Sequence, residues 1–321
     1  MPDSAFRPNY RRLVVPLDGS DLAEAALPVV AALARGLKAT VTLLHVLERG
    51  APPRVHGDRH LVERRAAEAY LAGAARRPPL RGLRVSWHVH RNDVGGLPKV
   101  LAQHEKELGH DLVVLCTHGW GGGRRAMLGS VAQRLASAGT LPVLVLRSPR
   151  PGARVAPVFR SILLALDADP RHGDAALDAA AQLARAFGAT VHVAVIVPTF
   201  GVRLGRWMLT GRLLPSTTAA LLDQSVADAE ALVARSCAAL GKTGVRADGR
   251  VLRGDPVRRL VRAASEVEAD LVALATHGRS GARALFTGSV ASRVASLCRR
   301  PLLLAPAPRI RSRPRRAAQR R

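Results

Sequence analysis

Apolar runs and amphipathic segments alternate along this chain in an order that occurs twice. The first series has an apolar run closed by an aspartate at residues 13–18, an alanine-rich segment of helical periodicity at 22–35, and a run rich in β-branched residues at 39–46. The second series repeats the three patterns at residues 162–167, 175–187 and 189–196. Short apolar runs that alternate with helical patterns predict strands of a parallel sheet covered by helices on both faces.

The two series match most closely near their ends. Each places Thr-His-Gly after its fourth apolar run, at residues 117–119 and 276–278, and a Gly-Ser pair further on, at 129–130 and 288–289. Each then closes on an apolar strand after a proline. The chain is therefore an internal repeat, and each copy is predicted to form an α/β domain of five strands and four helices.

The boundary between the copies is marked by composition. Residues 147–157 contain three prolines and one glycine, which is typical of a linker. We therefore place the first domain at residues 1–150 and the second at residues 158–308. The second copy also carries an insertion, which we place around residues 198–215.

The chain is strongly basic, with 49 lysines and arginines against 24 acidic residues and a formal net charge of +25. Residues 309–321 hold seven arginines and no acid, and we expect them to form a basic disordered tail. The rest of the chain is basic as well, which favours contact with nucleotides, nucleic acid or acidic lipid headgroups. Aromatic residues make up only 3%, which disfavours a surface that stacks nucleic-acid bases but leaves binding to phosphates open.

The cysteines and the lack of long apolar runs bear on location. The three cysteines are far apart and match no metal-ligand spacing, which favours a reducing compartment and no metal site. No apolar run approaches the roughly 20 residues of a membrane-spanning helix. Residues 1–12 contain no apolar signal core. We therefore expect a cytoplasmic protein without a membrane partner.

The segments after the fourth strands hold the pattern most relevant to ligand binding. In each copy a strand ends in a glycine, a loop with arginines follows, and a Gly-Ser pair opens a helix. These residues are Gly119, Gly129 and Ser130 in the first copy and Gly278, Gly288 and Ser289 in the second. Glycines allow backbone N–H groups to approach a ligand closely, and a helix N-terminus favours a phosphate. A plain turn with a serine cap is the alternative, and the recurrence of the pattern favours phosphate binding.

The same residues resemble a known family. Nucleotide-binding universal stress proteins carry a glycine, two residues, a second glycine, nine residues, and then glycine followed by serine or threonine. Both copies match this pattern from its second glycine onward, and residues 15–20, Val-Pro-Leu-Asp-Gly-Ser, also resemble the start of such proteins. The first glycine of the pattern is replaced by Cys116 and Ala275, which crowds the approach of the backbone to a ligand.

The resemblance implies a fold and a set of site residues. It implies doubly wound α/β domains with five parallel strands in the order 3-2-1-4-5, packed as an intramolecular pair with the final strands, at 143–146 and 302–304, as the contact edge. It also implies that an adenine nucleotide, ATP, binds with or without Mg²⁺. Asp18 and Asp167 would contact the adenosine, Val46 and Ile196 would meet the adenine, and the glycine-serine segments would hold the phosphates.

The leading functional prediction is a stress-response module that binds adenine nucleotide and regulates through ligand-dependent shape or association, including self-association. The alternatives are a basic nucleic-acid-binding or scaffold protein and a slow ATP-hydrolysing enzyme. No Walker A lysine, nucleophile elbow or other catalytic constellation occurs, so no catalytic residue is assigned. Where the first copy has Gly19-Ser20 the second has Ala168-Asp169, which would turn a carboxylate toward phosphate. We therefore expect the first site to bind ATP more tightly.

Overall fold

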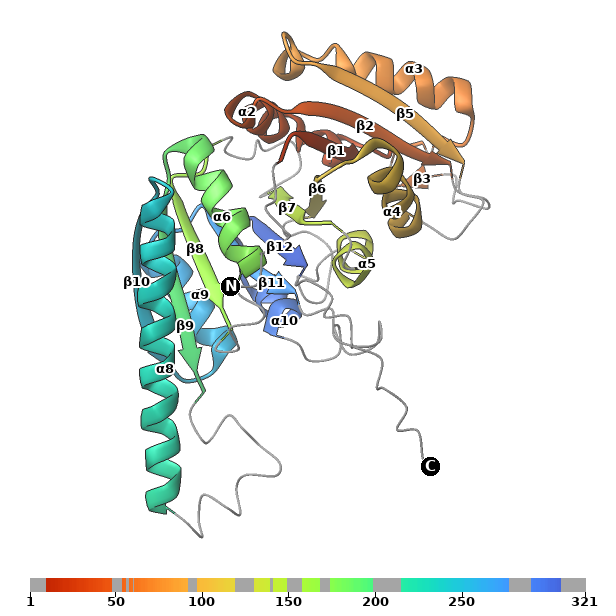
Figure 1. Cartoon of the computed structure of the whole chain (residues 1–321). Coiled ribbons are helices and arrows are strands. Elements are labelled where there is room, and N and C mark those ends of the chain that lie inside the picture. The colour runs from red at the N-terminus through yellow and green to blue at the C-terminus, as the bar shows by residue number, and fades with distance from the viewer. Residues whose placement is uncertain are drawn as a thin grey trace, which may run out of the picture.

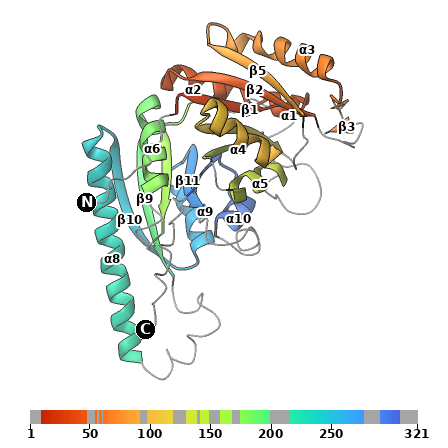
Figure 2. The same cartoon turned by 45° about the vertical axis from the view of Figure 1, so that its right-hand side comes forward.

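The chain folds into two α/β halves. The computed structural model describes residues 10–47, 54–55, 58–59, 61–91, 97–118, 130–138, 141–148, 158–167, 174–198, 215–276 and 290–306. Figure 1 shows the first half in red to yellow and the second in green to blue. Figure 2 shows the same two halves, in contact along one side, from a second direction.

In the first half, strands and helices alternate as the repeat predicts. Its main elements are β1 (Arg12–Pro16), α1 (Asp21–Glu24), α2 (Leu27–Leu37), β2 (Thr40–Leu47), α3 (Arg64–Ala75), β5 (Val85–Arg91), α4 (Leu97–Leu108), β6 (Leu112–His118), α5 (Ser130–Ala138) and β7 (Val143–Ser148). A small antiparallel pair, β3 (Arg54–Val55) and β4 (Asp58–Arg59), lies between β2 and α3, and the 3-10 helix η1 (Pro78–Leu80) precedes β5.

The second half repeats this order. Its elements are β8 (Ser161–Leu166), α6 (Asp174–Phe187), β9 (Thr190–Val197), α8 (Pro215–Lys242), β10 (Arg246–Arg253), α9 (Pro256–Glu266), β11 (Leu271–Thr276), α10 (Val290–Leu297) and β12 (Leu302–Pro306). The long helix α8 runs along the sheet and extends beyond it in Figure 1. The insertion predicted around residues 198–215 falls mostly outside the described residues.

All main strands join one sheet of ten, in the order β10-β9-β8-β11-β12-β7-β6-β1-β2-β5. Within each half the pairing is parallel and the strand order is 3-2-1-4-5, so the predicted fold class is confirmed. One buried cluster packs α2, α3, α6 and α8 on one face of the sheet. The other cluster packs α4, α5, α9 and α10 on the opposite face. The halves are therefore doubly wound.

The halves meet where their final strands pair. β7 and β12 form an antiparallel ladder in which Leu144 lies opposite Leu303. The prediction that the final strands form the contact edge is confirmed, and the two sheets continue into each other. Arg147 extends this contact, because its Nη2 donates to the carbonyl of Ala295 in α10 of the other half.

Two helices close the junction on one face. Helix α2 of the first half packs against α6 of the second. A Cβ at Gly36 would lie 3.0 Å from the Ala186 carbonyl oxygen, so the lack of a side chain there permits the close approach. The backbone N–H of Tyr10 donates to Gln182 Oε1 at 2.9 Å across the same junction. The two halves are therefore an intramolecular pair with a shared interface.

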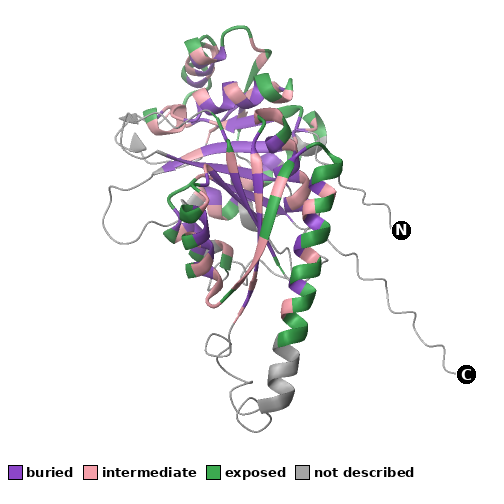
Figure 3. Ribbon diagram, turned by 90° about the vertical axis from the view of Figure 1, so that its left-hand side faces the viewer, coloured by how far each residue is buried: buried purple, intermediate pink, exposed green. Residues whose placement is uncertain are grey.

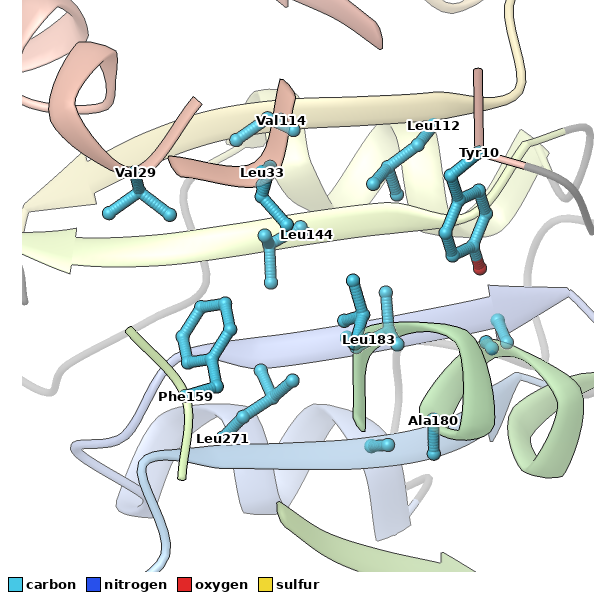
Figure 4. Packing of buried hydrophobic residues seen from close by; sticks show 14 of the residues in the cluster. Tyr10, Val29, Leu33, Leu112, Val114, Leu144, Phe159, Ala180, Leu183 and Leu271 are labelled. Carbon is cyan, nitrogen blue, oxygen red and sulfur yellow. The ribbon is translucent and has the colours of Figure 1, made fainter. Parts of the chain in front are cut away.

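The core is continuous across this junction. In Figure 3 the burial is concentrated in the strands and on the inner faces of the helices. Figure 4 shows Leu33 and Leu144 of the first half near Phe159 and Leu183 of the second, and all four belong to one buried cluster. Apolar side chains from both halves thus bury one another, which is the main favourable term in folding.

The helical segment predicted at 22–35 is divided in the structure. Helix α1 ends at Glu24, and α2 begins at Leu27 with Pro28 in its first turn. A proline has no N–H to donate and is tolerated in the first turn of a helix but not in its interior, so the chain restarts the helix there. The division leaves α1 as a short turn beside the end of β1.

Candidate functional site

The carboxyl ends of β1 and β6 define the candidate site of the first half. These strands are parallel neighbours, with Leu13 in register with Leu112. The chain leaves β1 toward α2 on one face, and it reaches α5 on the other face after β6. Neighbouring strands whose connections run to opposite faces form the topological switch point at which open α/β sheets bind ligands.

Asp18 lies just past the end of β1 in a tight polar turn. Its Oδ1 accepts a hydrogen bond from the Ser20 hydroxyl at 2.6 Å and another from the Ser20 backbone N–H at 3.0 Å. Ser20 is buried, and its Oγ accepts from the Ala23 N–H at 3.2 Å as the N-cap of α1. These bonds fix the Asp18 carboxylate at the edge where the switch point lies.

The turn requires a glycine between these two residues. Gly19 has a φ of 95°, in the left-handed region that favours glycine. A Cβ there would lie 3.1 Å from Leu61 Cδ1, so the backbone is also close to the segment that leads into α3. The Asp-Gly-Ser sequence therefore forms one hydrogen-bonded turn, and Leu61 lies against its glycine.

Val46 reaches the same edge from β2. Pro16 pairs with Leu44, so Asp18 and Val46 both lie two residues beyond a paired position on neighbouring strands. Val46 is half-buried and packs against the cluster on the face of α4 and α5. The structure therefore brings Asp18 and Val46 to one end of the sheet, with an apolar surface beside a carboxylate.

The second half presents the equivalent positions in a different state. Leu166 pairs with Val195, so Asp167, just past the end of β8, and Ile196 of β9 follow one residue later. Ile196 is half-buried against the α9 and α10 cluster, like Val46. Asp167, however, is exposed, whereas Asp18 is half-buried.

The predicted phosphate segments are described only in part. Gly119, Gly129, Gly278, Gly288 and Ser289 lie outside the described residues. Helix α5 begins at Ser130, and α10 begins at Val290, directly after Ser289. Both helices therefore begin at the predicted Gly-Ser pair or one residue after it.

The two replaced glycine positions occupy equivalent places in the sheet. Cys116 in β6 and Ala275 in β11 are half-buried and pack against the cluster that contains α2 and α6. No group of three or more histidine, cysteine, aspartate or glutamate side chains in the described ranges is arranged to hold a metal ion. None of the described helices has the length and apolar character that a membrane crossing requires.

Two features of the first site were not predicted from the sequence. His45 of β2 is buried, and its ring nitrogens lie 2.7 Å from the Leu17 carbonyl oxygen and 2.9 Å from that of Leu61. Burial and the Glu24 carboxylate raise the pKa of Tyr70 in α3. The same Glu24 carboxylate forms an ion pair with Arg77 at 2.9 Å. A histidine between Leu44 and Val46 within a strand is the sequence signal that could have indicated a polar contact there.

Comparison with known proteins identifies the family. The fold defines the class as a tandem of doubly wound α/β domains, each with a topological switch point at the carboxyl ends of its strands. The profile of the universal stress protein family matches residues 9–147 and 159–306. The chain therefore belongs to the universal stress protein family and contains two such domains.

Individual relatives match one domain or the whole fold. Universal stress protein YxiE of Bacillus subtilis is 26% identical over 150 residues, which cover 43% of this chain and 99% of the relative. A universal stress protein of Methanocaldococcus jannaschii is 28% identical over 148 residues, which cover 44% of this chain and 84% of the relative. The crystal structure of a universal stress protein from Archaeoglobus fulgidus covers 94% of this chain and all of its own, with a TM-score of 0.66 and 13% identity, and so supports the tandem fold.

Proposed function

We propose that this protein is a cytoplasmic stress-response module that binds an adenine nucleotide, ATP, in its first domain and regulates through ligand-dependent shape or association. The observation that carries the proposal is the Asp18 turn. Ser20 holds the carboxylate at 2.6 and 3.0 Å at the end of β1, beside the strand that leads to the Gly-Ser pair. A fixed acceptor at a switch point is a preorganised polar contact for a ligand.

Each part of the nucleotide has a chemical counterpart at this edge. The ribose hydroxyls are donors, and the Asp18 carboxylate is an acceptor. The adenine ring is apolar on its faces, and Val46 offers a half-buried apolar surface at the same level of the sheet. The phosphates are anions, and a helix that begins at Ser130 provides unpaired N–H donors at its first turn. Mg²⁺ would accompany the phosphates rather than bind a protein cluster.

The second domain is proposed to bind nucleotide more weakly. Asp167 is exposed, whereas Asp18 is half-buried and fixed by a serine. By sequence, Asp169 takes the place of Ser20, so the second half lacks the hydroxyl that donates to the carboxylate. A carboxylate in that position would also repel phosphate.

Isothermal titration with ATP tests the proposal. Gly129→Glu places a side chain and a negative charge where phosphate would lie, and we expect it to abolish the tight binding phase while the melting temperature stays near that of the wild type. Gly288→Glu is the matched control in the second domain and should leave that phase intact. Asp169→Ser should strengthen the weaker phase in the Gly129→Glu background. Equal tight binding by the wild type and Gly129→Glu would contradict the assignment of the first site.

The other functions predicted from the sequence remain distinguishable by experiment. A nucleic-acid role is suggested by the net charge of +25, and it predicts salt-dependent DNA binding that is lost when residues 309–321 are removed. Slow ATP hydrolysis would be detected as steady turnover. The proposed regulatory role predicts neither result.

A further inference from the structure

Two contacts between the halves join residues that are equivalent in the repeat. Leu144 of β7 lies opposite Leu303 of β12, and each is the second residue of its strand. Gly36 of α2 lies against Ala186 of α6, and each stands four residues before the next strand begins. The halves are therefore related by an approximate two-fold axis that passes near both contacts, as in a symmetric dimer.

The contact at Gly36 brings the C-terminal ends of α2 and α6 together. The strands β2 and β9 begin directly beyond these helix ends, so the amino-terminal edges of the two halves of the sheet converge at the same place. Figures 1 and 2 both show the ends of α2 and α6 side by side. This edge is opposite the carboxyl ends of the strands, where the candidate nucleotide site lies.

Six basic residues lie at this amino-terminal edge. Each stands at the start of a strand, directly before a strand, or in the last turn or C-cap of α2 or α6. Four belong to the first half, and two belong to equivalent positions of the second half. All six are exposed. We call them the junction basic cluster: Arg12, Arg35, Lys38, Arg84, Arg185 and Arg246.

Backbone carbonyl groups hold three of these side chains in place. Arg12 Nη1 donates to the carbonyl of Leu108, the last residue of α4, at 2.8 Å. Arg35 Nη2 donates to the carbonyl of Pro79 at 2.9 Å, and Arg246 Nη2 donates at 3.3 Å to the carbonyl that follows α6. Such bonds stabilise helix ends. A carbonyl oxygen does not neutralise a guanidinium, however, and each guanidinium has five donors, so charge and donors remain for a ligand.

Two carboxylates at this edge are engaged by the backbone. Asp111 accepts hydrogen bonds from the N–H groups of Arg11 and Arg12 at 2.7 and 3.0 Å, and Asp270 occupies the equivalent place in the second half. Within the part of the chain that the structure describes, no ion pair joins a side chain of the junction basic cluster to a carboxylate. The cluster therefore carries positive charge that an external anion can neutralise.

The arrangement of the cluster selects a class of anion. Five of its six members are arginines, whose planar fork matches a phosphate. Adjacent strands lie about 4.8 Å apart, so the starts of β1, β2 and β5 span about 10 Å, the length of about three steps of a duplex. The approximate two-fold axis suits a duplex, because symmetric proteins and duplexes bind with their axes aligned. Aromatic residues make up only 3%, which disfavours the stacking of unpaired bases.

We propose that the junction basic cluster binds the phosphate backbone of duplex nucleic acid without reading its sequence. Each half contributes cations to the surface, so the binding site belongs to the fused pair. The proposal does not depend on nucleotide binding, because the cluster lies at the opposite edge of the sheet. It also differs from a nucleic-acid role of residues 309–321, because it assigns the contacts to the folded domains.

Fluorescence anisotropy with a labelled duplex of about 20 base pairs, in the absence of ATP, tests the proposal. We expect the affinity of the wild type to fall about a thousandfold from about 50 to about 200 mM salt, since about six phosphate contacts release counterions. The triple variant Lys38→Gln/Arg84→Gln/Arg185→Gln removes three of these contacts. It should bind about a hundredfold more weakly at about 100 mM salt, with a salt slope less steep by about 2 to 3.

A matched triple variant removes the same charge from the other edge of the sheet. Arg65 lies in the first turn of α3, Arg91 ends β5, and Arg258 lies in the first turn of α9, and all three are exposed. Replacing them with glutamine should change the affinity by less than about threefold, because they lie beyond the screening length from the cluster. Equal losses in the two triple variants, or no duplex binding by the wild type at about 50 mM salt, would overturn the proposal.

The remaining arms identify the anion and separate this proposal from nucleotide binding. Tighter binding to a single strand of the same length, or to vesicles of phosphatidylcholine and phosphatidylserine, would overturn the assignment to a duplex. Duplex binding that depends on the cluster, in a wild type that does not bind ATP, would support this proposal and contradict the proposed function. Circular dichroism checks folding. If the triple variant does not fold, Arg84→Gln alone should make the salt slope less steep by about 1, and an unchanged slope would overturn the proposal.

Discussion

Leu144→Ala tests whether the two halves share one core. Leu144 is fully buried in β7, lies opposite Leu303 of the other half, and projects in Figure 4 toward the layer that holds Phe159 and Leu183. The substitution removes three carbons, worth roughly 0.8 kcal/mol each, and leaves a cavity bordered by both halves. We therefore expect the free energy of unfolding to fall by about 3 kcal/mol.

Hydrogen exchange followed by mass spectrometry shows where this loss is felt. Leu144→Ala should raise exchange in β6 and β7 and also in β11 and β12 of the second half. Leu71→Ala is the matched control, because Leu71 is equally buried but lies in α3, which packs on β5 and β2. It should raise exchange in the first half alone. If Leu144→Ala left β11 and β12 unchanged, the reasoning about a shared core would be refuted.

Three further predictions follow from individual contacts. Asp270 accepts hydrogen bonds from the Arg160 and Ser161 N–H groups at 2.8 and 3.0 Å. Asp270→Ala should therefore lower the free energy of unfolding in urea by about 2 kcal/mol, and Asp270→Asn should lower it less. Equal losses would contradict a role for the side-chain acceptor. Burial lowers the pKa of His110 to about 4, so the folded protein binds fewer protons at this residue than the unfolded chain does. The resulting stabilisation is complete above about pH 6.5 and is lost as the pH drops toward about 4. We expect the free energy of unfolding to fall by about 2 kcal/mol over this interval, allowing for screening of the histidine by solvent. His110→Leu should flatten that profile, and an unchanged slope would assign it to other groups. Arg147 is buried and donates to the Ala295 carbonyl. Arg147→Ala should lower the free energy of unfolding by about 2 to 3 kcal/mol because it leaves a void at the junction, whereas Arg147→Met should lower it by less than about 1 kcal/mol. Similar losses for the two variants would show that the charge matters more than the volume.

Much of the fold could be predicted from the sequence because the pattern of apolar positions is strong and occurs twice. The runs that begin near Leu13 and Ile162 are all-apolar, as strands buried on both faces must be, and both lie at the centre of a half. The final strands were predicted as the contact edge and pair at Leu144 and Leu303. The break between α1 and α2 was missed because an alanine-rich stretch outweighed the effect of Pro28.

The buried polar contacts could not be predicted in the same way. His45 and Arg147 are polar residues in apolar strands, and pattern alone places such side chains toward water. Their partners come from segments distant in sequence: Leu61 lies 16 residues from His45, and Ala295 lies 148 residues from Arg147. Only the assembled sheet brings these carbonyl groups within reach. The Asp18 turn, by contrast, is local, because the Ser20 groups that donate to the Asp18 carboxylate lie two residues further along the chain.

The central claim is that the first domain holds an adenine nucleotide, and mass spectrometry of ligand released from freshly purified protein tests it most directly. Wild-type protein and Gly129→Glu should be purified in parallel and denatured, and the released small molecules compared. We predict that adenine nucleotide is released from the wild type and that its amount falls sharply in Gly129→Glu but not in Gly288→Glu. Release of no adenine nucleotide from the wild type, even after incubation with ATP, would contradict the account.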